Sequence, residues 1–176
     1  IQYTGGDHVV IGGTAGRDTI IGGIGDDSLW GREGNDRIEG GDGADHIEGG
    51  PGDDIITDLA GPDVIEGGAG NDAIASGNEE DVIFGDDGHD FIINASEFGE
   101  IFAGPGDDFI LDGVFLGHIR GGTGDDWMEN LGGGEDLFQG DTGAAPEGGE
   151  PGHKGNDVLI SHAGNNDGDM ENGDDI

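Results

Sequence analysis

The alternation of apolar and polar residues along the chain repeats every nine residues. Cut from Gly13, the sequence divides without a gap into thirteen nonapeptides that end at Glu129, from GTAGRDTII to GGTGDDWME. The eighth position is apolar in all thirteen, and holds Ile20, Leu29, Ile38, Ile47, Ile56, Ile65, Ile74, Ile83, Ile92, Ile101, Ile110, Ile119 and Met128. One inward-facing apolar residue between two outward-facing neighbours is typical of a very short β-strand.

A strand with a single core residue cannot bury that residue alone, so successive nonapeptides must stack on one another. Glycines at positions one, two and four allow positive φ and close backbone approach, as a tight turn every nine residues requires. We expect two nonapeptides to form one 18-residue coil, with one strand in each of two facing parallel sheets. The pattern therefore predicts an all-β fold, a right-handed parallel β-roll whose coils stack at about 4.8 Å.

The phase of the repeat also predicts how the chain is organised. It gives a partial repeat over 1–12, an uninterrupted array over 13–129, a bulge and inserted loop over 130–151, and continued repeats over 152–176. The bulge is expected at Asn130.

Beyond the array, the pattern is interrupted from Gly140 to Pro151 and then returns in its old phase. We expect this segment to loop out of the roll rather than to form a second domain. Gly168 falls at a core position, which argues against a strand over 161–169. Because the sequence stops inside a repeat at Ile176, we expect it to be a segment of a longer protein.

Aspartate occupies the sixth position in eleven of the thirteen nonapeptides, so an 18-residue coil arranges these aspartates in two columns. The first column contains Asp18, Asp36, Asp54, Asp72, Asp90, Asp108 and Asp126, and after the loop Asp157 and Asp175. The second column contains Asp27, Asp45, Asp63 and Asp81, and then stops at Gly99 and Gly117. Its turns also lose their glycines, from GGIG and GGDG to DLAG, SGNE, NASE and DGVF. The two columns are therefore predicted to bind metal unequally, with Asp81 holding at most one weak ion.

Carboxylates stacked one strand spacing apart repel each other unless a cation lies between them. Oxygen ligands, many of them backbone carbonyls in glycine turns, suit a hard ion with six or more ligands. This favours calcium over magnesium or zinc, with several ions bound per chain. The strict recurrence of aspartate and glycine makes a solvated acidic tail a poor explanation.

Composition narrows the remaining function classes. The formal net charge is −36, with 41 acidic residues and 43 glycines, which disfavours nucleic acid as a partner. Without cysteine there is neither a disulfide framework nor a thiolate metal site. No apolar run approaches the roughly 20 residues of a membrane span. The six histidines share no zinc-ligand spacing, and no Ser/His or Cys/His arrangement indicates catalysis.

The repeat has the pattern GGxGxDxUx and resembles the RTX (repeats-in-toxin, hemolysin-type) calcium-binding family over almost the whole chain. The resemblance implies that each ion lies between sixth-position aspartates of two stacked turns and is also held by their carbonyls. It further implies a non-catalytic module, exported by type I secretion from a Gram-negative bacterium, that folds when it meets extracellular calcium. A secretion signal would then lie beyond Ile176.

Two other functions stay open. The segment IRGGTGDDWMENLGGGEDLFQGD resembles RTX regions of bacterial animal-type haem peroxidases, and RTX blocks also accompany proteases, lipases and epimerases. The first alternative is that the chain is the C-terminal region of a secreted enzyme. The second is that it is a surface adhesin. Outward positions become apolar from the middle of the array onward, which is typical of contact surfaces for self-association or a neighbouring domain. They are Val82, Phe84, Phe91, Ile93, Phe102, Phe109, Leu111 and Trp127.

Overall fold

In the computed structural model the nonapeptides form short strands that alternate between two parallel sheets. The structure describes residues 1–3, 5–95, 98–113, 117–131, 137–140, 156–161 and 167–169. The nine-stranded sheet contains β1 (Val10–Gly12), β3 (Ser28–Trp30), β5 (His46–Pro51), β7 (Val64–Ala69), β9 (Val82–Asp87), β11 (Glu100–Pro105), β13 (His118–Thr123), β15 (Leu137–Gln139) and β17 (Asp167–Asp169). The eight-stranded sheet contains β2 (Thr19–Ile24), β4 (Arg37–Asp42), β6 (Ile55–Thr57), β8 (Ala73–Ser76), β10 (Phe91–Asn94), β12 (Phe109–Asp112), β14 (Trp127–Asn130) and β16 (Val158–Ser161).

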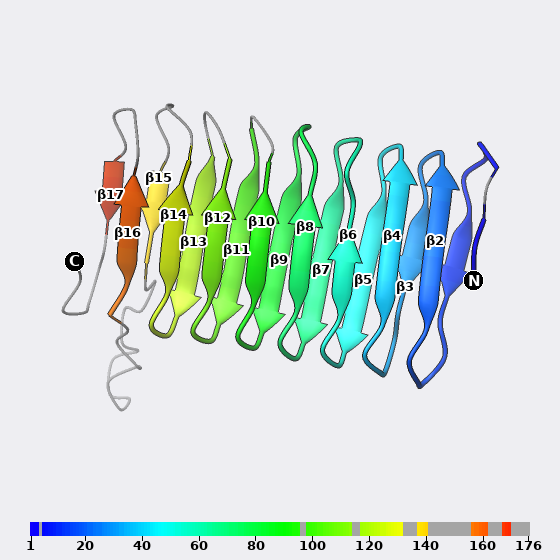
Figure 1. Cartoon of the computed structure of the whole chain (residues 1–176), viewed down its shortest axis with the longest axis horizontal. Coiled ribbons are helices and arrows are strands. Elements are labelled where there is room, and N and C mark those ends of the chain that lie inside the picture. The colour runs from blue at the N-terminus through cyan, green and yellow to red at the C-terminus, as the bar shows by residue number, and fades with distance from the viewer. Residues whose placement is uncertain are drawn as a thin grey trace, which may run out of the picture.

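The chain winds between these sheets as a solenoid (Figure 1), so the predicted β-roll is confirmed. Each strand pairs in parallel with the strand two further along, and from β1 to β14 the offset is 18 residues. Ile38, for example, lies between Ile20 and Ile56 in the eight-stranded sheet. No helix that could cross a membrane occurs among the residues described above.

The core is a double row of the eighth-position side chains, one row from each sheet. All thirteen are at most 1% exposed, and Ile11 and Phe138 extend the rows at the two ends. Full burial of one such side chain contributes roughly 2 kcal/mol. Because each coil supplies only two of these side chains, the core exists only when coils stack.

The offset departs from 18 residues in the last three strand pairings, while the order of the strands is kept. His118 pairs with Leu137, which places one extra residue after Asn130. Trp127 pairs with Val158, which is an offset of 31 residues. Residues 141–151 of the predicted loop fall outside the described residues. The expectation against a strand over 161–169 was wrong in part, because β17 pairs with β15 and Gly168 lies beside Phe138.

Glycine at position four is required where the turns stack. Gly70 has a φ of +138°, and a Cβ added there would lie 2.5 Å from the carbonyl carbon of Gly52 in the preceding coil. Any other residue would combine an unfavourable backbone conformation with a collision. This contact fixes how closely the coils approach.

The outward apolar residues form two separate stacks, one on each sheet. On the eight-stranded sheet, Phe91 and Phe109 stack with ring centroids 5.3 Å apart, and Phe109 stacks on Trp127 at 6.2 Å. On the nine-stranded sheet, Phe84 and Phe102 stack at 5.1 Å, with the Arg120 guanidinium 5.2 Å from the Phe102 ring. We call these the Phe109 stack and the Phe102 stack. The apolar outer residues therefore belong to opposite faces of the roll.

Candidate metal centre

The first aspartate column lies in the turns that lead into the even-numbered strands, along the lower edge of the roll in Figure 1. In this column the backbone N–H of one aspartate donates to Oδ1 of the aspartate one coil later. The N···O distance is 2.7 Å from Asp54 to Asp72 and 2.8 Å from Asp72 to Asp90. The same bond continues from Asp126 to Asp157 at 3.0 Å, across the inserted loop. The structure therefore stacks eight of the predicted ligands, from Asp18 to Asp157, while Asp175 lies outside the described residues.

The other carboxylate oxygen, Oδ2, is buried and accepts no hydrogen bond. This is true in the first column of Asp36, Asp54, Asp72, Asp90 and Asp108. A Cβ added to Gly67 would lie 2.6 Å from Asp72 Oδ2 and 2.7 Å from the carbonyl oxygen of Gly85. Two oxygen acceptors thus face the same small space, which a side chain at position one would fill. Such an arrangement is stable only with a proton or a cation between the oxygens.

Burial without a counter-charge changes the acidity of these groups. It raises the pKa of Asp54 and Asp90 to about 6, from the ordinary 3.8, although an N–H from the preceding coil partly offsets the rise. The pKa of Asp72 and Asp108 rises to about 7 for the same reason. A bound cation would favour the ionised form and reverse these shifts. Ionisation of these buried carboxylates is therefore unfavourable without a cation, and a bound cation would make it favourable.

The second column has the same geometry where its aspartates are present. The N–H groups of Val9, Asp27, Asp45 and Asp63 donate to Oδ1 of Asp27, Asp45, Asp63 and Asp81, at 2.8, 2.7, 2.8 and 3.1 Å. Oδ2 of each of these four aspartates is buried and has no hydrogen-bond partner. The column then ends, because Gly99 and Gly117 follow in the next two coils.

From the turn of Asp81 onward, the position-one residues of the second column are polar and buried instead of glycine. Ser76, Asn94 and Asp112 are at most 3% exposed and stand 18 residues apart. Ser76 Oγ donates to Asn94 Oδ1 at 2.8 Å, and Asn94 Nδ2 donates to Asp112 Oδ1 at 3.1 Å. We call these three residues the buried polar ladder.

From the sequence, these turns were expected to be degraded repeats. The recurrence of a polar residue at position one was the signal that could have revealed them.

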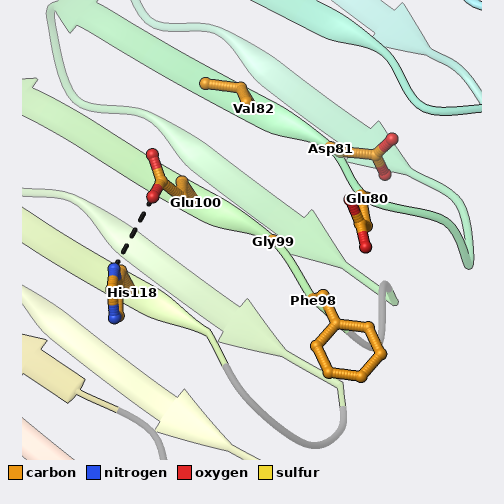
Figure 2. Close-up of a pocket in the computed structure, with 7 residues that line it drawn as sticks. All are labelled: Glu80, Asp81, Val82, Phe98, Gly99, Glu100 and His118. Atoms are coloured by element: carbon orange, nitrogen blue, oxygen red, sulfur yellow. Dashed lines mark ion pairs between the residues drawn. The ribbon is translucent and has the colours of Figure 1, made fainter.

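A shallow hollow of about 360 Å³ marks the end of the second column (Figure 2). It opens beside Gly99, with the exposed ring of Phe98 on one side. In Figure 2 the carboxylate of Glu100 turns toward His118, 3.6 Å away, rather than toward Asp81. The acidic groups of the hollow therefore do not converge on one point, in contrast to those inside the turns.

The donor set inside the turns fits calcium. It consists of carboxylate and backbone carbonyl oxygens, with no thiolate or imidazole among the groups that line the space at Gly67. Calcium accepts many oxygen ligands in tolerant geometry, whereas magnesium demands a strict octahedron and keeps its waters. The sixth-position aspartates would supply Oδ2, and the position-one residue of the next coil a carbonyl.

These features define the class of protein, a parallel β-solenoid whose turns carry columns of buried aspartates able to hold metal. The family model of the RTX calcium-binding nonapeptide repeat matches in four copies, at residues 12–47, 48–82 and 75–95. Residues 12–95 therefore match RTX calcium-binding repeats, as their GGxGxDxUx pattern predicts. No curated protein and no solved structure matches the chain.

Proposed function

We propose that this chain is a calcium-dependent folding module of a larger exported protein, without catalytic activity of its own. The observation that carries the proposal is the set of buried Oδ2 atoms that lack a hydrogen-bond donor in both columns. At low calcium, carboxylate repulsion and the conformational entropy of 43 glycines oppose folding. At the higher calcium outside a cell, ion binding supplies the free energy of folding. Type I secretion from a Gram-negative bacterium is the export route that the RTX repeats favour.

Calcium titration tests this function. We expect the metal-free chain at neutral pH to lack cooperative β-structure and to gain it on addition of calcium. Magnesium at the same concentration should produce much less, because the sites are rich in backbone oxygens and rigid. Circular dichroism with calcium, with magnesium and with excess EGTA measures the difference. A full β-sheet spectrum in EGTA at pH 7 contradicts the proposal.

A docking role is a second candidate, favoured by the Phe109 stack. Phe91 is 44% exposed and Trp127 is 37% exposed, although each ring packs on Phe109. Rings stacked along one face of a rigid sheet form the kind of contiguous apolar strip that marks contact surfaces. The role would be self-association or contact with a neighbouring segment of the parent protein.

Replacement of Phe109 by Ser separates a structural from a docking role. Because Phe109 contacts a ring on each side, we expect Phe109→Ser to lower the stability of the calcium-loaded chain by about 1 to 3 kcal/mol. Phe91→Ser removes the more exposed end ring, so it should cost less stability. Chemical denaturation in calcium measures both changes, and light scattering measures association. If Phe91→Ser leaves scattering and stability unchanged, the strip has no docking role in the isolated chain.

A further inference from the structure

One turn of the second column combines an aspartate at position one, in place of the usual glycine, with the sixth-position aspartate. The position-one residue is Asp58, in the nonapeptide DLAGPDVIE. It is 1% exposed, and its carboxylate lies close to those of Asp45 and Asp63. One carboxylate oxygen from each of the three residues lies within 4.8 Å of the others.

The orientation of Asp58 is fixed by the backbone. The N–H of Gly41 donates to Asp58 Oδ1 at 3.3 Å, which leaves Oδ2 facing the interior of the turn. Oδ2 has no hydrogen-bond partner, and the same is true of Oδ2 in Asp45 and Asp63. Each of these three side chains is at least 97% buried. The site thus rests on unsatisfied, buried oxygens and not on acidic composition alone.

The space at Gly40 shows what Asp58 changes. In a regular turn, such as that of Gly22, an added Cβ would meet one carboxylate oxygen, of Asp27, and the carbonyl oxygen of the next coil, of Gly40. At Gly40 the two nearest atoms are instead Oδ2 of Asp58 and Oδ2 of Asp45. A carboxylate thus takes the place that a carbonyl holds in the regular turn.

We propose that Asp45, Asp58 and Asp63 form a distinct calcium site, with three side-chain carboxylates around one ion, that binds more tightly than the regular turns. The inference rests on the proposed calcium-binding function and adds a residue that the nonapeptide pattern assigns no ligand role. A regular position between two stacked turns offers two sixth-position carboxylates, so this site carries one additional negative charge. Calcium sites gain affinity as their ligand charge rises. The site should therefore be the last to lose its ion, and it should prefer a trivalent lanthanide more strongly than its neighbours do.

A shared proton is a competing way to satisfy these oxygens. Burial, together with the charges of Asp63 and Asp45, raises the pKa of Asp58 to about 8. Without a cation, the cluster would then hold a proton at neutral pH. Ion and proton compete for the same oxygens, and a binding experiment distinguishes them.

The test compares Asp58→Asn, which keeps the shape and removes the charge, with Asp58→Gly, which restores the regular repeat. Asp42→Asn is the matched control, because it removes one exposed carboxylate from the turn one coil earlier. Calcium-loaded full-length chains are titrated with EGTA, and the ions retained are counted. We expect the wild-type chain to keep one ion at free calcium roughly tenfold lower than the rest. Both Asp58 variants should lose this tight class, while Asp42→Asn keeps it.

Terbium gives an independent measurement in the same proteins. In excess calcium, we expect one terbium ion per wild-type chain, and none in either Asp58 variant. Circular dichroism at saturating calcium verifies that each variant folds. If wild-type calcium dissociates as a single class that Asp58→Asn leaves unchanged, the cluster holds only a proton and the inference is overturned. If the wild-type chain binds no calcium at all, the proposed function itself fails.

Discussion

Replacement of Asp72 by Ala is expected to raise the calcium concentration at the midpoint of folding by roughly three- to tenfold. Asp72 lies in the middle of the complete column. Its Oδ1 accepts from Asp54, its N–H donates to Asp90, and its Oδ2 faces the carbonyl of Gly85. Its carboxylate therefore belongs to the ion positions both below and above it, and its loss weakens both.

The same substitution at Asp81 should shift the midpoint by less than about twofold. Oδ1 of Asp81 accepts from Asp63, but Gly99 stands one coil later, so the position above offers no second carboxylate. Position one of its own turn is Ser76 instead of glycine, which fills part of the space for an ion. Both variants lose one buried carboxylate, so net charge cannot explain a difference. Calcium titration by circular dichroism, with ions counted by calorimetry, makes the comparison. Equal shifts would mean that the columns are equivalent.

The pH dependence of folding should change sign when calcium is removed. In the metal-free roll six buried aspartates have pKa values of about 6 to 8, against 3.8 for an ordinary aspartate: Asp54, Asp58, Asp63, Asp72, Asp90 and Asp108. A folded pKa above the unfolded value means that the folded state binds more protons. The resulting destabilisation is complete above about pH 8, and it disappears as the pH falls toward 3.8. Mild acid should therefore promote compact structure in the metal-free chain.

With calcium bound, acid should have the opposite effect. The ions hold the carboxylates in their ionised form, so the folded pKa values lie below those of the unfolded chain and stability is lost as the pH falls. In the mild acid at which the metal-free chain is compact and its buried aspartates are protonated, calcium binding should also release protons, whereas binding at pH 9 should release very few. Circular dichroism over pH 4 to 9 with calcium or EGTA measures the first effect, and calorimetry in buffers of different ionisation enthalpy measures the second. A metal-free chain that gains no structure in mild acid would contradict the assignment.

The regularity of the nonapeptide made the fold predictable from the sequence. A one-residue slip would move every isoleucine out of the core, so the apolar eighth position specifies the register of both sheets. The columns followed from the same register, including the position of Asp157 after the loop. The hydrogen bonds from each aspartate N–H to Oδ1 of the aspartate one coil later could not be predicted, because residue spacing does not show which oxygen a donor contacts.

In the second column, the roles of the residues that depart from the nonapeptide consensus could not be predicted from the sequence. The consensus predicts that a turn without glycine at position one is a degraded repeat. In the structure, however, Asp58 lies in a cluster of carboxylates. Hydrogen bonds also link Ser76 to Asn94 and Asn94 to Asp112. The consensus describes what a regular turn contains and says nothing about what replaces it. Similarly, outward apolar residues can be read from the sequence, but their division into two stacks on opposite sheets depends on which sheet each nonapeptide enters.

The buried polar ladder has a consequence for how the roll responds to a falling calcium supply. In a linear array each coil interacts mainly with its neighbours, so stability is a sum of local contributions. Near the N-terminal end both edges rely on ions, whereas from Ser76 to Asp112 one edge is closed by uncharged donors and a hydroxyl-to-amide relay. That stretch needs fewer ions per coil. We therefore expect this stretch, together with the coils held by the site of Asp45, Asp58 and Asp63, to stay folded longest when calcium becomes scarce, so that the roll unfolds in stages rather than all at once.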